Sequence, residues 1–156
     1  IDAVKLANDT LKSTGMKRPR IGVAALNPHA GDAGNFGREE IDILSPAVAR
    51  ASELQIDVNG PWPSDTVFLR ARDGLLDAVV TMYHDQGQIA MKLLGFERGV
   101  TIAAGLPIAV ATPAHGTAFD IAGRGIANLG AMRKAFDVLC RMAPNFRQDH
   151  SKTQAS

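Results

Sequence analysis

The most informative stretch of this chain is Thr112-Pro-Ala-His-Gly-Thr-Ala-Phe-Asp-Ile-Ala-Gly-Arg-Gly-Ile-Ala-Asn128. It places three glycines beside His115, Asp120 and Asn128 in one turn-rich connection. Glycine permits positive φ and lets a ligand approach the backbone closely. The three polar side chains offer the donors and acceptors that adenine and ribose hydroxyls require. These residues alone leave two interpretations open, a nucleotide site and a loop that merely leads into a helix.

Two further motifs begin where short apolar runs stop. Residues 21–26 and 78–82 are typical of buried strands, and they are followed by Asn27-Pro-His-Ala-Gly31 and Tyr83-His-Asp-Gln-Gly87. In an open α/β sheet, ligands bind beyond the carboxyl ends of the strands, so His29 and His84 should lie at the same edge. Neutral imidazole is a common ligand for divalent metals. Two histidines do not complete a metal site, and a loop histidine bonded to local backbone is the alternative for each.

The apolar pattern alternates between strands and helices along the chain. We expect helices over residues 38–54, 66–72, 86–94 and 127–142, after a helix that opens the chain, and strands over 21–26, 56–58, 78–82, 100–103 and 108–112. This alternation predicts an α/β fold with a largely parallel sheet flanked by helices. We expect one lobe over residues 1–144 and a frayed polar tail over 145–156.

Composition excludes several classes of function. Lys plus Arg number 17 against 16 for Asp plus Glu, so no net charge recruits nucleic acid. The longest apolar region, residues 100–114, is too short to span a membrane and is interrupted by glycine and proline. The single cysteine, Cys140, excludes an intramolecular disulfide, and its apolar neighbours predict a packed thiol. These features fit a cytoplasmic protein. The first residue is Ile rather than Met, and the chain opens inside a helical pattern, as a truncated protein would.

Six motifs, in order, resemble the 4-hydroxythreonine-4-phosphate dehydrogenase family, within the isocitrate/isopropylmalate dehydrogenase-like superfamily. The motifs are Asn27-Pro-His-Ala-Gly, Gly37-Arg-Glu-Glu, Gly60-Pro-Trp-Pro-Ser-Asp-Thr66, Tyr83-His-Asp-Gln-Gly, Lys92-Leu-Leu-Gly-Phe96 and His115-Gly-Thr-Ala-Phe-Asp-Ile-Ala-Gly123. The resemblance implies an NAD-dependent homodimer about twice this length, with two α/β lobes per subunit and active sites shared across the dimer interface. This chain resembles the C-terminal half, one lobe of the two-lobe fold.

The resemblance also implies a chemistry. A divalent cation (zinc, cobalt or magnesium) binds the substrate hydroxyl while hydride leaves the carbinol carbon for NAD, and decarboxylation can follow. His29 and His84 match two metal ligands, contributed to one site by different subunits, and a third histidine lies upstream of this chain. Lys92 matches a catalytic, substrate-contacting lysine. Asp85 and Asp65 are catalytic candidates that orient ligands or accept a proton. The cofactor-binding candidates are His115, Gly116, Thr117, Asp120 and Asn128. By contrast, Asp32, Glu39 and Glu40 are expected to be surface carboxylates.

The expected substrate is a small phosphorylated hydroxy acid. Thr101 and Val110 stand where the pyridoxine branch of the family carries an asparagine and an arginine, and losing an arginine removes a bidentate anion partner. Thr101 remains a substrate-binding candidate. The context of His115 resembles paralogues that oxidise 4-phosphothreonate or 4-phosphoerythronate. Two alternatives stay open: a dehydrogenase for cis-dihydrodiols of aromatic acids, and a non-catalytic nucleotide-binding or interface fragment.

Overall fold

A computed structural model describes the backbone of residues 1–153 and the side chains of residues 1–95 and 97–144. Contacts divide the chain into two compact units. One is formed by residues 1–12 and 16–90, and the other by residues 13–15 and residues 91 onward. The expected single lobe over residues 1–144 therefore stays a prediction.

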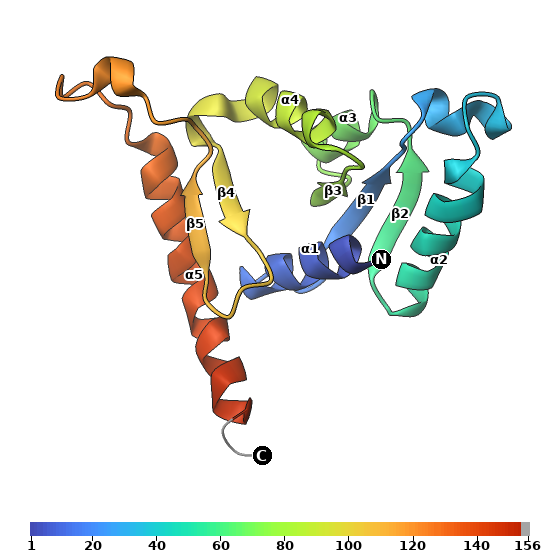
Figure 1. The fold of residues 1–156 in the computed structure, drawn as a ribbon. Coiled ribbons are helices and arrows are strands. Elements are labelled where there is room, and N and C mark those ends of the chain that lie inside the picture. Colours follow the sequence, from blue (N-terminus) through green and yellow to red (C-terminus); the bar gives the residue numbers. More distant parts are fainter. Residues whose placement is uncertain (154–156) are drawn as a thin grey trace. The chain divides into compact units, whose positions relative to one another are not determined.

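The first unit is built on a parallel sheet (Figure 1). Its strands are β1 (Arg20–Ala24), β2 (Asp57–Trp62) and β3 (Ala78–Val80), in the order β2-β1-β3. Ile21 in the central strand pairs with Val58 on one side and Ala78 on the other. The predicted α/β fold with a parallel sheet is therefore confirmed in this unit.

Helices cover both faces of this sheet. Alternate residues of a strand point to opposite faces, and β1 shows this division. Ile21 and Val23 pack in one cluster with residues of α1 (Asp2–Ser13) and α2 (Ser45–Glu53). Ala24 packs in a second cluster with Val67 of α3 (Val67–Arg72). Burial on both faces explains why β1 is a continuous apolar run.

Two local predictions in this unit need correction. The strand expected over residues 56–58 continues through Gly60-Pro-Trp62 as part of β2, where Gly60 has a φ of 139° and a Cβ would fall 2.6 Å from the carbonyl oxygen of Val23. The helix expected over residues 38–54 begins instead as a π-helical turn, η2 (Glu40–Leu44), and continues as α2. Pro46 stands in the first turn of α2, where its missing N–H leaves no hydrogen bond unmade.

The second unit holds an antiparallel hairpin and a long helix. After α4 (His84–Gly95) and the short η3 (Phe96–Arg98), β4 (Val100–Ala103) pairs with β5 (Val110–Pro113), so that Thr101 lies opposite Thr112. A 3-10 turn, η4 (Phe119–Ile121), precedes α5 (Gly130–Thr153), which packs against both strands. Four buried residues share one face of α5: Ala131, Ala135, Val138 and Met142.

The C-terminal helix corrects two further predictions. It was expected to end at residue 142, but α5 continues to Thr153 with Pro144 inside it. Residues 145–153, expected to belong to the polar tail, lie within this helix, and residues 154–156 lie outside the described part. That the tail frays stays a prediction. Cys140 is exposed rather than packed, because it lies off the buried face of the helix. Within the described residues, every helix is too short or too polar to cross a membrane.

One ion pair fixes the start of the central strand. The Asp77 carboxylate accepts hydrogen bonds from Arg20 Nε at 2.9 Å, from the other guanidinium branch at 2.8 Å and from the Arg20 backbone N–H at 2.9 Å. These bonds to Arg20 lower the pKa of Asp77 to about 2. The side chain of Asp77 is 19% exposed and that of Arg20 is 45% exposed, so solvent screens part of the attraction.

The Arg20–Asp77 pair should make stability depend on pH. A lowered folded-state pKa stabilises the fold above the unfolded value and loses that effect as pH falls toward the folded value, here between about pH 5 and pH 2. Asp77→Asn should lower the free energy of unfolding by about 1 kcal/mol at pH 7. By about pH 3 roughly half of this difference should be gone, because the folded-state pKa of Asp77 is about 2. Urea titrations at both pH values measure it. Asp73→Asn, in the exposed Arg72–Asp73 pair, is the control. An equal loss for Asp77→Asn at both pH values would contradict the assignment.

Candidate functional site

A cavity of about 380 Å³ lies at the carboxyl edge of the parallel sheet. It is lined by residues that follow each of the three strands: Leu26, Asn27, Pro28, His29, Ser64, Asp65, Tyr83 and Gln86. The structure therefore brings two predicted site residues, His29 and Asp65, to one cavity. His84 and Asp85 adjoin it in sequence but do not line it.

His29 lies on an unusual turn, η1 (Pro28–Gly34). Five consecutive residues, 29 to 33, have positive φ, and four of them are not glycine: His29 at 55°, Ala30 at 54°, Asp32 at 44° and Ala33 at 54°. A left-handed backbone costs an L-residue about 1–2 kcal/mol. Such strain persists only where the surrounding structure enforces it, and it is frequent at functional sites.

Glu40 is buried directly beside this turn, contrary to the prediction of a surface carboxylate. It is 3% exposed, and its Oε1 accepts hydrogen bonds from the backbone N–H groups of Leu26 at 2.8 Å and Asn27 at 2.7 Å. Burial alone would raise the pKa of Glu40, but the hydrogen bonds from Asn27 and Leu26 hold it below its ordinary value. Glu40 is therefore a carboxylate that anchors the backbone. The other two expected surface carboxylates do lie nearer solvent, with Asp32 exposed and Glu39 half-buried.

Gln86 joins three segments at the cavity, and sequence reasoning missed it. Its Nε2 donates to the Ala25 carbonyl and to Ser64 Oγ, both at 2.9 Å, and its Oε1 accepts from the Met82 backbone N–H at 2.9 Å. The Ser64 hydroxyl also donates to Ala25 O at 2.6 Å. Helix α3 has Thr66 at its N-cap and no side-chain capping bond. The only sequence signal for Gln86 was its place in the His84 motif.

His84 and Asp85 form the first turn of α4 rather than a loop. His84 Nδ1 lies 2.8 Å from Asp85 Oδ1, and both side chains are about three quarters exposed, at 77% and 74%. A carboxylate on one ring nitrogen orients an imidazole so that the other nitrogen is left for a metal. This donor set fits a divalent cation only in part, because no group of three or more His, Cys, Asp or Glu able to hold a metal occurs among the described residues.

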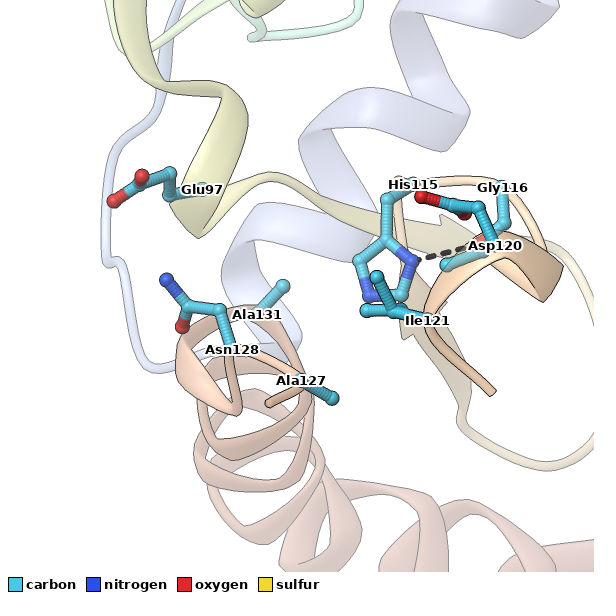
Figure 2. Close-up of a pocket in the computed structure, with 9 residues that line it drawn as sticks. Glu97, His115, Gly116, Asp120, Ile121, Ala127, Asn128 and Ala131 are labelled. Atoms are coloured by element: carbon cyan, nitrogen blue, oxygen red, sulfur yellow. Dashed lines mark hydrogen bonds between the residues drawn. The ribbon is translucent and has the colours of Figure 1, made fainter. Parts of the chain in front are cut away.

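A second cavity, of about 520 Å³, lies in the second unit. Its lining includes four of the five predicted cofactor-binding residues, and Thr117 is the exception. The complete lining is Glu97, His115, Gly116, Ala118, Asp120, Ile121, Ala127, Asn128 and Ala131. In Figure 2, Glu97 and Asn128 lie on one side of the cavity, and His115 and Asp120 lie on the other. Glu97 is a lining residue that sequence reasoning missed.

Local hydrogen bonds and glycines shape this second cavity. His115 Nδ1 contacts the Gly116 carbonyl at 2.9 Å, and Asn128 Oδ1 accepts from the Gly130 N–H at 2.8 Å, so the Asn128 side chain closes a turn immediately before α5. Positive φ is confirmed at Gly123 and Gly125 but not at Gly116. A Cβ at Gly116 would meet no atom of this chain within 4 Å, so the backbone there is open to a ligand. The volume suits the adenosine half of a dinucleotide.

Two predicted substrate-binding residues lie outside both cavities. Lys92 is exposed on α4, and Thr101 is exposed on β4. Thr101 and Val110 share one face of the hairpin, because Thr101 pairs with Thr112, Ala103 pairs with Val110, and alternate residues point the same way. Thr101 and Val110 are therefore neighbours in space.

Known proteins resemble this chain over nearly its whole length. The family described as "Pyridoxal phosphate biosynthetic protein PdxA" matches residues 1–139. A Pseudomonas aeruginosa protein, named provisionally as 4-hydroxythreonine-4-phosphate dehydrogenase 2, is 61% identical over 143 residues, which are 90% of this chain and 42% of that protein. D-threonate 4-phosphate dehydrogenase of Pectobacterium atrosepticum is 50% identical over 140 residues, covering 90% of this chain and 43% of that protein.

Solved structures give the same likeness. A crystal structure of 4-hydroxythreonine-4-phosphate dehydrogenase from Klebsiella pneumoniae matches with a TM-score of 0.73 and 49% identity, over 89% of this chain and 41% of that chain. A terephthalate 1,2-cis-dihydrodiol dehydrogenase from Burkholderia xenovorans matches less well, with a TM-score of 0.58 and 32% identity, over 89% of this chain and 44% of that one. The chain thus spans about two fifths of the length of the relatives it matches.

The left-handed turn can be tested with glycine, which usually lowers stability in a helix but should raise it at a residue with positive φ. Ala33→Gly should raise the free energy of unfolding by roughly 0.5 kcal/mol or more, because glycine adopts positive φ without steric strain. The matched control is Ala49→Gly, at an exposed position in α2, which should lower it by about 1 kcal/mol. Urea unfolding of both variants measures the difference. A loss of stability in Ala33→Gly as large as in Ala49→Gly would contradict the left-handed backbone.

Proposed function

The chain belongs to the PdxA family of pyridoxal phosphate biosynthetic proteins, and on that basis we propose that the complete protein is an NAD-dependent dehydrogenase. Its substrate is a small phosphorylated hydroxy acid that carries a secondary alcohol. Support comes from the relatives, which are named as dehydrogenases of 4-hydroxythreonine 4-phosphate or of D-threonate 4-phosphate.

The observation that carries the proposal is the second cavity, in which His115, Gly116, Asp120 and Asn128 converge. In this proposal it binds the adenosine half of NAD. Two carboxylates, Glu97 and Asp120, line it and can accept hydrogen bonds from ribose hydroxyls. The same negative charges would repel a 2′-phosphate, which favours NAD over NADP. Thr117 does not line the cavity and is left out of the proposed set.

The first cavity, at the sheet edge, carries the alcohol chemistry in this proposal. His29 and His84 would hold a divalent cation, either zinc, cobalt or magnesium, and such an ion makes a bound hydroxyl more acidic and stabilises alkoxide charge. Asp85 orients the His84 ring through its 2.8 Å contact. Asp65, which lines the cavity with His29, would accept the hydroxyl proton, and NAD would supply the hydride acceptor when bound. Lys92 binds the phosphate or carboxylate as a point charge.

The proposed assembly is a homodimer with shared active sites. In it, His29 and His84 of one chain serve different sites, so each site takes one of these histidines from each subunit. A two-fold interface produces two such sites. A binding module without catalysis would take up NAD but need no metal, and an interface fragment would take up neither. Calorimetric titration with NAD and with Zn²⁺ separates these three cases.

The cofactor assignment can be tested at Asp120. In the complete enzyme, Asp120→Ala should raise the Michaelis constant for NAD by about tenfold, the loss of roughly 1.4 kcal/mol of binding. The Michaelis constant for the hydroxy acid should change by less than about twofold, because the variant loses a contact to the cofactor and none to the hydroxy acid. Thr117→Ala is the matched control, because Thr117 belongs to the same motif but lies off the cavity. Equal effects of Asp120→Ala on both Michaelis constants would argue against the assignment.

The substrate can be tested at the hairpin face that carries Thr101 and Val110. Phosphorylated threonate or erythronate should have a higher kcat/KM than 4-hydroxythreonine 4-phosphate, because no arginine stands at position 110 to bind a second anion. The double variant Thr101→Asn with Val110→Arg should shift this preference toward 4-hydroxythreonine 4-phosphate by about tenfold or more. Steady-state kinetics with each substrate, followed by NADH absorbance, measures it. A wild-type preference of at least about tenfold for 4-hydroxythreonine 4-phosphate would reject the idea. Preference for a cis-dihydrodiol would reject the whole substrate class.

A further inference from the structure

The turn that carries His29 cannot be held by local preference alone. Its backbone is left-handed from residue 29 to residue 33, and only Gly31 among these residues adopts that region freely. Bonds at its exit run from the N–H groups of Asn35 and Phe36 to carbonyls within the turn, at 3.1 Å each. They close the turn but do not tie it to the rest of the first unit. That tie must come from elsewhere in the chain.

Glu40 supplies this tie at the entry to the turn. Its two carboxylate oxygens accept three hydrogen bonds from the two residues that precede Pro28: Leu26 N at 2.8 Å, Asn27 N at 2.7 Å and Asn27 Nδ2 at 2.9 Å. Hydrogen bonds to an ionised acceptor are about twice as strong as neutral ones. Glu40 also begins the π-helical turn η2, a distortion that is frequent at functional sites.

The same carboxylate also lies against the middle of the turn. Gly31 is buried, and a Cβ built on it would fall 2.8 Å from Glu40 Oε2 and 2.9 Å from the carbonyl oxygen of Gly37. The backbone of Gly31 therefore rests on the carboxylate. Glu40 thus contacts the turn on both sides of His29 in sequence, although it does not itself line the cavity.

We propose that Glu40 is a positioning residue, whose buried carboxylate sets the left-handed turn and so fixes where His29 presents its imidazole. It acts through the backbone of Leu26 and Asn27 and does not touch substrate or cofactor. The proposal has two parts. Binding of a divalent cation by His29 rests on the proposed function, whereas placement of the His29 ring by Glu40 is independent of it. The two parts can therefore fail separately.

The test compares two neighbouring substitutions in the complete protein. Glu40→Gln keeps the shape of the side chain but removes the charge and places an NH2 group among N–H donors. Glu39→Gln is the matched control, because Glu39 contacts the same residue only through Asn27 Nδ2, at 2.7 Å. A purely structural role would lower the unfolding temperature of Glu40→Gln without moving the ring of His29.

The first measurement is the NMR signal of the His29 ring in metal-free protein labelled with 13C-histidine, assigned by its loss in His29→Ala. The ring centroid of His29 lies 5.9 Å from that of Phe36, so its chemical shift reports its placement. Glu40→Gln should move this signal, and Glu39→Gln should not. The second measurement is calorimetric titration with Co²⁺. Glu40→Gln should weaken Co²⁺ binding at least about tenfold, as loss of a supporting group around a metal ligand does, and Glu39→Gln should stay within about twofold.

An unshifted His29 signal in a folded Glu40→Gln protein overturns the proposal. If the signal moves but Co²⁺ affinity stays within about twofold, Glu40 does not act on metal binding, and that part is overturned. Should Glu40→Gln fail to fold, Glu40→Asp decides, since it keeps the charge and withdraws it by one methylene. If the wild type binds no Co²⁺, the proposed metal function is wrong, and the His29 signal still decides whether Glu40 positions the ring.

Discussion

The way β1 ends is the constraint on which the first unit depends. β1 is the central strand, and the chain leaves the sheet after Ala24. Buried backbone N–H and C=O groups there need hydrogen-bond partners, because leaving them unpaired costs folding free energy. Four backbone groups at this exit have partners. The Ala25 N–H donates to the Trp62 carbonyl at 2.8 Å, and the Ala25 carbonyl accepts from Ser64 and Gln86. The next two N–H groups go to Glu40. Segments that follow all three strands therefore meet at one point, and the cavity lies there.

Much of the first unit could be predicted because its signals are local. The apolar run that became β1 is buried, that of β3 is half-buried, and the histidine motifs follow them as an open sheet requires. What could not be predicted depends on partners far apart in the sequence. Glu40 follows Glu39 in a pattern typical of an exposed first helical turn, and its burial is decided by N–H groups 13 and 14 residues earlier. Gln86 bonds to Ala25, 61 residues away. The sequence of residues 29–33 gives little indication of a continuous left-handed backbone, because the alanines at positions 30 and 33 normally avoid it.

In the second unit, too, some features could be predicted from the sequence and others could not. The cofactor motif could be found because its residues lie close in sequence and line one cavity, all but Glu97 within residues 115–131. Strand direction could not be read from the apolar pattern, and the last two strands pair antiparallel across the connection 104–109. The length of α5 was also missed, because its final turns are polar and contain Pro144, which usually ends a helix. Cys140 lies on the exposed side of that helix. Its apolar neighbours in the sequence therefore did not imply that its thiol is packed.

The left-handed turn also limits how this loop can vary in any library of sequences. Proline is confined to negative φ, so it is barred from residues 29–33, and β-branched residues are strongly disfavoured there. Random mutagenesis of these positions, selected for folded protein, should therefore enrich glycine, asparagine and aspartate. The side chains that such a loop can offer to chemistry are correspondingly few. Histidine, like asparagine and aspartate, is found at positive φ more often than most residues, whereas alanine is not. The turn therefore accepts an imidazole at position 29 with less backbone strain than it accepts the methyl groups of Ala30 and Ala33.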